Sequence, residues 1–173
     1  NIITRINLSL NCHRKSHQYP NTLDDWGYYL AGLIDSDGSF TNILDNQPNL
    51  TICFHIKDIS LAYKIRSFLN YGTISKIKNK NACTYVLTNQ FGFLKLLPLL
   101  NNKLKHQDKL KRYFLLCKHY NLSFPIGQEE QSLVPIDLLN NWWFSGFIDG
   151  DGSFQIKIIH KQNRLKHEVR LQL

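Results

Sequence analysis

The chain has 173 residues, a hydrophobic content of 43%, an aromatic content of 12% and a formal net charge of +8. This composition excludes an intrinsically disordered chain, and no apolar run reaches the ~18 residues that a membrane-spanning helix needs. The excess of Lys and Arg favours a polyanionic partner, most often nucleic acid, although a merely well-solvated surface carries the same charge. The four cysteines include no Cys-x-x-Cys pair, which disfavours a zinc site.

The first 120 residues predict a basic arm followed by a lobe of helices and β-hairpins. The arm covers residues 1–20, and Asn21 and Thr22 then provide a helix-start signal for a helix that runs to about residue 34, with Gly38 ending it. Hydrophobic period and turn residues predict the elements that follow, which are strands over 39–47 and 50–56, a helix over 57–70, strands over 73–78 and 82–87, and helices over 91–100 and 107–120.

The last third of the chain predicts a linker and the start of a second lobe. Residues 121–134 are a polar connector, and Pro135 stands at the first turn of a new helix, where its missing N–H costs nothing. Strands over 153–159 and 164–173 follow this helix. The expected domains are therefore the arm (1–20), a first lobe (21–120), the linker (121–134) and the start of a second lobe (135–173).

One phrase occurs twice in the chain. Residues 28–40 read YYLAGLIDSDGSF and residues 142–154 read WWFSGFIDGDGSF, 114 positions later. Small residues in each copy allow two helix backbones to approach closely, so we expect the two helices to pack together about a two-fold axis. The small residues expected at this contact are Ala31, Gly32, Ser145 and Gly146.

Each copy of the phrase places two aspartates at a predicted helix C-terminus. The helix dipole disfavours a carboxylate there by ~0.3–1 kcal/mol, and Asp37 and Asp151 would also repel each other if the helices pack in parallel. A divalent cation between them removes both costs, because Mg²⁺ is typically held by one or two carboxylates together with substrate phosphates. The alternative is that each aspartate pair only caps a turn before Gly, which the matched repetition disfavours.

The strings LAGLIDSDG (30–38) and FSGFIDGDG (144–152) resemble the two signature motifs of single-chain LAGLIDADG homing endonucleases. The resemblance extends over roughly residues 24–173, because HIKD at 55–58, NYGTI at 70–74 and a basic run around 103–109 follow the order of that family. It implies an α+β fold in which an αββαββα lobe is repeated with pseudo-two-fold symmetry, the second repeat being incomplete in this chain. It also implies four-stranded saddles that lie in the major groove of DNA.

The same resemblance implies a site-specific endonuclease that hydrolyses phosphodiesters on both strands of DNA at the interface of the two motifs. The catalytic and metal-binding roles carry over to Asp37 and Asp151, with Mg²⁺ as the cofactor and Ca²⁺ or Mn²⁺ as its substitutes in vitro. Asp35 and Asp149 are expected to form hydrogen bonds near the helix ends instead.

His55 and Lys105 are the further catalytic residues that the resemblance suggests, with roles in organising the attacking water and offsetting phosphate charge. Lys103 is the substitute for Lys105, and Lys109 and Lys111 compete with both. For His55 the alternative is a polar residue at a strand end without a part in catalysis.

The strands of such a saddle present alternate residues to the DNA. Carboxamides read adenine, whereas Lys reads guanine or contacts phosphate. The residues expected to contact DNA are Ser39, Thr41, Asn49, Thr51, Ser75, Lys76, Lys78, Lys80, Thr84, Ser153, Gln155 and Lys157.

Two other functions remain open at this point. The chain could be an intron-encoded RNA maturase that assists splicing, with or without nuclease activity, or a DNA-binding relative without catalysis, although the retained acids favour the nuclease. The expected partners are double-stranded DNA with a long asymmetric target, a separate chain that completes the second lobe, and intron RNA. The abundance of Asn, Ile, Lys and Phe is typical of AT-rich genes and suggests an organellar, mitochondrial origin.

Overall fold

The structure is a computed structural model that describes residues 19–123, 140–151, 155–159 and 168–172. Pro20–Asp151 form one unit, and the second unit contains the strands after residue 152. Most of the expected basic arm and linker, Pro135 and Ser153 lie outside the described residues.

The first motif helix, α1, covers Leu23–Asp37 and begins at the predicted cap. The Thr22 hydroxyl accepts a hydrogen bond of 3.1 Å from the Asp25 N–H, and the Asp25 carboxylate accepts one of 3.3 Å from the Thr22 N–H. Such a reciprocal cap stabilises a helix by about 1 kcal/mol. The helix continues three residues further than predicted and ends at Gly38, so both aspartates of the motif lie in its last turn.

A four-stranded antiparallel sheet follows α1, in the order β1-β2-β4-β3. Its strands are β1 (Gly38–Thr41), β2 (Asn49–His55), β3 (Thr73–Lys76) and β4 (Ala82–Leu87). The strand predicted over 39–47 was too long, because Asn42 and Asn46 adopt left-handed backbone conformations, with φ of 54° and 56°, that end the extended chain. The strand predicted over 73–78 likewise stops at Lys76, just before the turn that contains Asn79 with φ of 60°.

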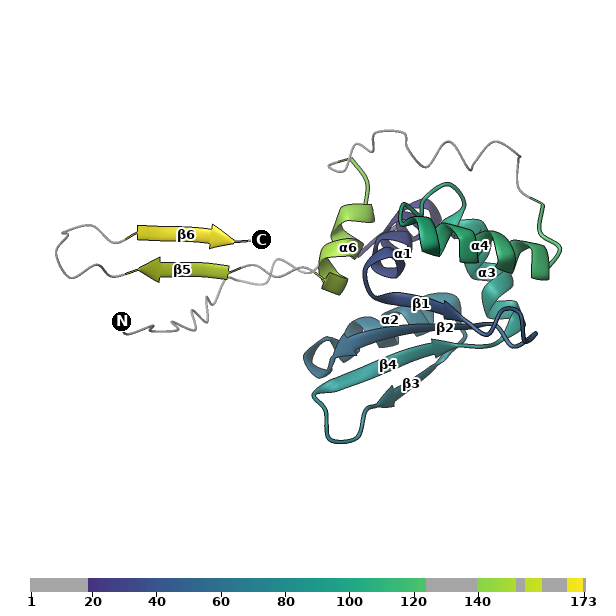
Figure 1. The fold of residues 1–173 in the computed structure, drawn as a ribbon, viewed down its shortest axis with the longest axis horizontal. Helices are drawn as coiled ribbons and strands as arrows, with labels where there is room; N and C mark the ends of the chain where they lie inside the picture. Colours follow the sequence, from purple (N-terminus) through teal and green to yellow (C-terminus); the bar gives the residue numbers. More distant parts are fainter. Residues whose placement is uncertain (1–18, 124–139, 152–154, 160–167, 173) are drawn as a thin grey trace. The chain divides into compact units, whose positions relative to one another are not determined.

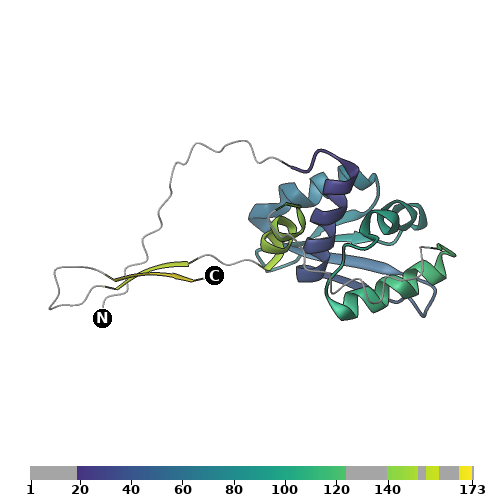
Figure 2. The same ribbon diagram turned by 90° about the horizontal axis from the view of Figure 1, so that it is seen from above.

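Helices cover one face of this sheet and leave the other face open. The helices are α2 (Ile59–Leu69), which follows a 3₁₀ turn at Ile56–Asp58, α3 (Gln90–Leu100) and α4 (Gln107–His119). Figures 1 and 2 show α1, α3 and α4 together on one side of the sheet. Residues of β2 and β4 alternate between buried and partly exposed positions, which is the pattern of a sheet with one covered face.

The second motif helix, α6, covers Trp143–Asp151 and packs beside α1 (Figure 1). The sequence predicted one helix from Pro135 through the second motif, but α6 starts only at Trp143. Residues 140–142 are not helical, and the side-chain oxygen of Asn141 accepts a hydrogen bond of 2.9 Å from the Trp143 N–H. In the second unit, β5 (Gln155–Ile159) and β6 (Glu168–Gln172) form an antiparallel pair, as predicted. Among the described helices, none has the length and apolar character to cross a bilayer.

Candidate active site

The two motif helices meet at a pair of glycines. A Cβ atom on Gly32 would overlap the carbonyl oxygen of Trp143, and one on Gly146 would overlap the carbonyl oxygen of Tyr29. Gly146 and Trp143 stand 114 positions after Gly32 and Tyr29, so the two contacts are equivalent under a pseudo-two-fold axis. Only glycine allows the backbones of α1 and α6 to approach this closely.

The other small residues of the motifs differ in their surroundings. Ala31 is buried, but Ser145 is exposed, so Ser145 does not belong to the contact for which it was predicted. The reason is its position one residue before Gly146, which turns its side chain about 100° away around the helix. Gly150 lies against Ser36, its equivalent in the first motif, and a Cβ there would come within 2.9 Å of the Ser36 Cβ.

The first acid of the first motif is buried and fully used by hydrogen bonds. Asp35 is 5% exposed and accepts bonds from the backbone N–H groups of Lys105 at 2.7 Å and His106 at 3.2 Å. The indole N–H of Trp143 donates a third bond of 3.0 Å. Burial raises the pKa of Asp35, and these hydrogen bonds act in the opposite direction.

The first acid of the second motif has the equivalent partner. The hydroxyl of Tyr29 donates a hydrogen bond of 2.6 Å to the carboxylate of Asp149. Tyr29 lies in α1 at the position that Trp143 occupies in α6. The first acid of each motif therefore holds the opposite helix, in agreement with the hydrogen bonds expected near the helix ends.

The second acids, Asp37 and Asp151, remain exposed, and neither has a hydrogen bond to another described residue. Partial removal from water and the negative charge of Asp151 raise the pKa of Asp37, whereas the positive charge of Lys109 lowers it. The two carboxylates are thus close enough to repel each other. This geometry concentrates negative charge at one end of the paired helices.

The pair of second acids, Asp37 and Asp151, has the chemistry of a divalent-cation site. The described residues contain no group of three or more His, Cys, Asp or Glu side chains with metal-binding geometry, which argues against a closed protein cage. Hard cations such as Mg²⁺ prefer oxygen ligands and commonly use one or two carboxylates, with water and substrate phosphates as the remaining ligands. Asp37 and Asp151 supply such a set, and their mutual repulsion would be relieved by a cation.

Lys109 is the basic residue that the structure brings into the field of Asp37. Its ammonium group donates to the carbonyl oxygen of Gly38, and Arg112, one turn later in α4, donates to that of Phe40 at 2.5 Å. These contacts join α4 to β1, which is an edge strand of the sheet. Sequence reasoning named Lys109 as a competitor only, because the basic run gives no signal for which Lys faces the strand.

The two lysines favoured from the sequence are engaged elsewhere. Lys105 contributes its backbone N–H to Asp35; burial lowers the pKa of its ammonium group, against the opposing effect of the Asp35 charge. The ammonium group of Lys103 lies 3.0 Å from the Asp24 carboxylate and 5.0 Å from the centre of the Tyr28 ring. Their roles in a reaction stay predictions.

His55 occupies the end of β2. Its Nδ1 atom accepts a hydrogen bond of 3.2 Å from the Lys57 N–H and thereby caps the short 3₁₀ turn that follows. This is the strand-end role that the sequence left open. A further role for His55 in catalysis stays a prediction.

The residues expected to contact DNA divide between four locations among the described residues. Six share the open face through the strand register, which pairs Ser39 with Thr51, Thr41 with Asn49, and Ser75 with Thr84. Lys76 pairs with the buried Cys83, so it belongs to the other side of the sheet, where it is exposed on an edge strand, and its contact with DNA stays a prediction. Lys78 and Lys80 lie exposed in the turn between β3 and β4, and of Gln155 and Lys157 the structure describes only the backbone.

Sequence reasoning missed four further residues of the open face, namely Cys53, Thr73, Ala82 and Val86. The register pairs Cys53 with Thr84 and Val86 with Thr51, which are predicted positions, and it pairs Thr73 with Val86 and Ala82 with His55. The period-two alternation through β2 and β4 could have identified them. The described open face carries no Asp or Glu, which suits a polyanionic partner.

Comparison with known proteins relates the chain to one family. A family model described as LAGLIDADG endonuclease matches residues 30–120. The chain is 36% identical over 167 residues to an uncharacterized cox1 intron-2 protein of Schizosaccharomyces pombe, covering 94% of this chain and 49% of that protein. It is 24% identical over 169 residues to the intron-encoded DNA endonuclease ai2a of Dictyostelium discoideum, covering 92% of this chain and 52% of that one. The chain therefore spans about half the length of these relatives.

A third relative is named as an RNA maturase. The intron-encoded RNA maturase bI4 of Saccharomyces cerevisiae is 29% identical over 126 residues, which is 72% of this chain and 18% of the maturase. Among solved structures, the LAGLIDADG meganuclease I-CpaMI bound to uncleaved DNA matches with a TM-score of 0.52 and 23% identity, over 84% of this chain and 65% of that one. At this identity the match establishes the fold.

Proposed function

The chain belongs to the LAGLIDADG endonuclease family, and from that premise we propose that it acts in site-specific cleavage of double-stranded DNA. One observation carries the proposal: each motif commits its first acid to the opposite helix and leaves its second acid, Asp37 or Asp151, free beside the other. Structural packing alone gives no reason to place two repelling carboxylates together. Binding of a cation that acts on a phosphodiester gives such a reason.

In the proposed mechanism, Asp37 and Asp151 would hold the divalent cation, for which Mg²⁺ is the first candidate and Mn²⁺ and Ca²⁺ are the substitutes in vitro. A bound cation of this kind polarises a phosphodiester and lowers the pKa of a water molecule. Asp35 and Asp149 fix the relative position of the two helices and thereby of the free acids. Lys109 places positive charge beside Asp37, where it also offsets the charge of an approaching phosphate.

The open face of the sheet is the proposed DNA-binding surface. Its hydroxyl and carboxamide side chains can read base edges, and the net charge of +8 favours association with the phosphate backbone. A long asymmetric target needs a complete second lobe as well. We propose that further polypeptide, in the same chain or in a separate one, supplies the strands that complete it.

A DNA cleavage assay tests the proposal. Its substrate is a copy of the intron-bearing gene from which the intron has been removed, since that copy carries the uninterrupted target. The full-length protein with Mg²⁺ is expected to cut both strands at one position, and a chelator is expected to abolish cutting. Asp37→Asn should remove the activity, whereas Asp58→Asn, a change at another exposed acid, should leave it intact. Cutting that persists in Asp37→Asn would refute the proposed site.

The similarity to an RNA maturase favours a second candidate function. An intron-encoded maturase would bind its own intron RNA and accelerate splicing, with or without DNA cleavage. A splicing assay with the intron RNA distinguishes the two functions, because acceleration of splicing without any DNA cleavage would assign the chain to the maturases. The similarity to a cox1 intron protein supports a mitochondrial origin under either function.

A further inference from the structure

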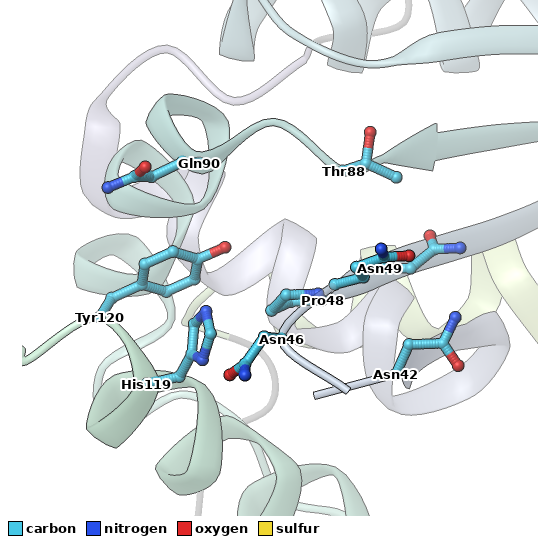
Figure 3. A pocket seen from close by; sticks show the side chains of 9 residues that line it. Asn42, Asn46, Pro48, Asn49, Thr88, Gln90, His119 and Tyr120 are labelled. Carbon is cyan, nitrogen blue, oxygen red and sulfur yellow. The ribbon is translucent and has the colours of Figure 1, made fainter. Parts of the chain in front are cut away.

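A hollow of about 490 Å³ lies at the end of the sheet opposite to Asp37, and nine residues line it (Figure 3). Three chain junctions form its walls: the turn between β1 and β2, the start of α3 and the end of α4. Figure 3 shows His119 and Tyr120 together on one side, facing Asn46 and Pro48 on the other. Its volume falls within the roughly 300–1,000 Å³ that is typical of small-molecule sites.

The lining of this hollow is mostly polar. Five of the nine residues carry carboxamides, namely Asn42, Asn46, Gln47, Asn49 and Gln90. No Lys, Arg, Asp or Glu is among the described lining residues, so carboxamides rather than charged groups dominate what the hollow offers to a ligand. Of the five carboxamides, Asn49 is the one with a described side-chain hydrogen bond, which it accepts from the Thr51 hydroxyl at 3.3 Å.

The aromatic wall of the hollow is held in a defined orientation. The Tyr120 ring stacks on Phe93 with ring centres 5.6 Å apart and planes at 27°. The His119 ring stands nearly perpendicular to Tyr120, at 4.7 Å and 86°. Rings fixed in this way give a planar ligand a stacking surface without a further loss of side-chain entropy.

We propose that this hollow binds the base of an unpaired nucleotide, which goes beyond cleavage of paired DNA. A nucleobase is planar and uncharged, and its edge carries the neighbouring donors and acceptors that a carboxamide matches bidentately. Unpaired bases are recognised by this combination of aromatic stacking and edge hydrogen bonds. Asn49 lies both in the hollow and on the open face of the sheet, so a strand on that face can direct a base into the hollow while its phosphates stay in solvent.

An NMR titration of the 173-residue chain with adenosine tests the proposal. The ring protons of His119 and Tyr120 are expected to shift in a saturable way, with a dissociation constant of about 1 mM for a ligand of this size. Ribose alone and inorganic phosphate serve as controls and are expected to cause no shift. Absence of a saturable response to adenosine, or an equal response to ribose, would overturn the proposal.

Two matched variants separate binding from folding. Gln90 and Gln107 are exposed first residues of α3 and α4, and only Gln90 lines the hollow. Gln90→Ala is expected to weaken adenosine binding about fivefold, the effect of one hydrogen bond, whereas Gln107→Ala should leave it unchanged. Equal effects of the two variants would contradict the proposed site. Asp37→Asn should retain adenosine binding, so the proposed base site and the proposed cleavage site can be refuted independently.

Discussion

Tyr29 donates a hydrogen bond of 2.6 Å to Asp149, and Trp143 donates one of 3.0 Å to Asp35. The two donors are equivalent positions of the repeated phrase, and so are the two acceptors. The bonds are therefore related by the same pseudo-two-fold axis as the contact at the two glycines. Together they divide the four motif acids into two that hold the helices and two that remain free.

Removal of the Tyr29 hydroxyl should loosen this arrangement. Tyr29→Phe leaves the ring in place but deprives Asp149 of its donor, and we expect the free energy of unfolding to fall by about 1–2 kcal/mol. Tyr28→Phe, a neighbouring change outside this hydrogen bond, serves as the control. Urea unfolding followed by circular dichroism measures both, and an equal effect of the two variants would contradict the role given to Tyr29.

The close contact at Gly32 and Gly146 should reverse the usual effect of a Gly→Ala substitution on helix stability. Ala is normally preferred to Gly inside a helix by about 1 kcal/mol, yet Gly32→Ala and Gly146→Ala should each destabilise the protein, by about 2 kcal/mol or more, because the new methyl group meets backbone atoms. Ser145→Ala, on the exposed side of α6, should be neutral. Thermal unfolding distinguishes these cases, and a stabilised Gly32→Ala would refute the close approach of the helices.

The basic residues of the site should rank in a specific order. Lys109→Met removes the positive charge that acts on Asp37, so we expect the single-turnover cleavage rate to fall about tenfold or more, equivalent to ~1.4 kcal/mol. Lys111→Met is the matched control, since Lys111 is exposed and pairs with Asp108 on the same helix. A larger loss for Lys103→Met or Lys105→Met than for Lys109→Met would contradict the arrangement described for α4.

The thiols give a direct probe of the open face. Cys53 is exposed there, whereas burial raises the pKa of Cys83 and raises that of Cys117 to about 11. The thiolate is the reactive form, so at pH 8 iodoacetamide should modify Cys53 much faster than the two buried thiols.

Protection of Cys53 by DNA then tests which face binds. The measurement uses mass spectrometry on a Cys12→Ser variant, with and without bound target DNA. Slower modification of Cys53 in the complex is expected, while an unchanged rate would place the DNA on another surface. The reaction of Cys117 should become appreciable only as the pH approaches 11.

Much of the fold could be predicted from the sequence because its signals are local. The cap at Thr22, the turn residues and the hydrophobic periods determined the order of helices and strands. The strand predicted over 39–47 was too long because the sequence pattern stays compatible with an extended chain beyond Thr41. Only the left-handed conformation of Asn42, which the pattern does not reveal, ends the strand there. The start of the second motif helix was missed for a similar reason, since the hydrogen bond that the Asn141 side chain accepts before this helix is a weaker signal in the sequence than Pro135.

The site was predictable only where the repeat itself carried the information. The repeat identified Asp37, Asp151 and the two glycines, because a duplicated phrase implies equivalent positions. It did not reveal that Tyr29 and Trp143 are the donors to Asp149 and Asp35, since hydrogen bonds between distant residues depend on how the helices pack. The choice among Lys103, Lys105 and Lys109 also depends on tertiary contacts, and the charge run alone does not resolve it.

Asp35 and Asp37 have different roles, one in holding the helices together and one in cleavage, and one paired measurement tests this difference most directly. Unfolding free energy and DNA cleavage are measured for Asp35→Asn and Asp37→Asn. Asp35→Asn should lower the free energy of unfolding by about 1–3 kcal/mol, because a carboxamide cannot accept all three bonds that the carboxylate accepts. Asp37→Asn should abolish cleavage while leaving stability equal or higher, since it removes the repulsion from Asp151. A destabilised Asp37→Asn that still cuts DNA would contradict the account.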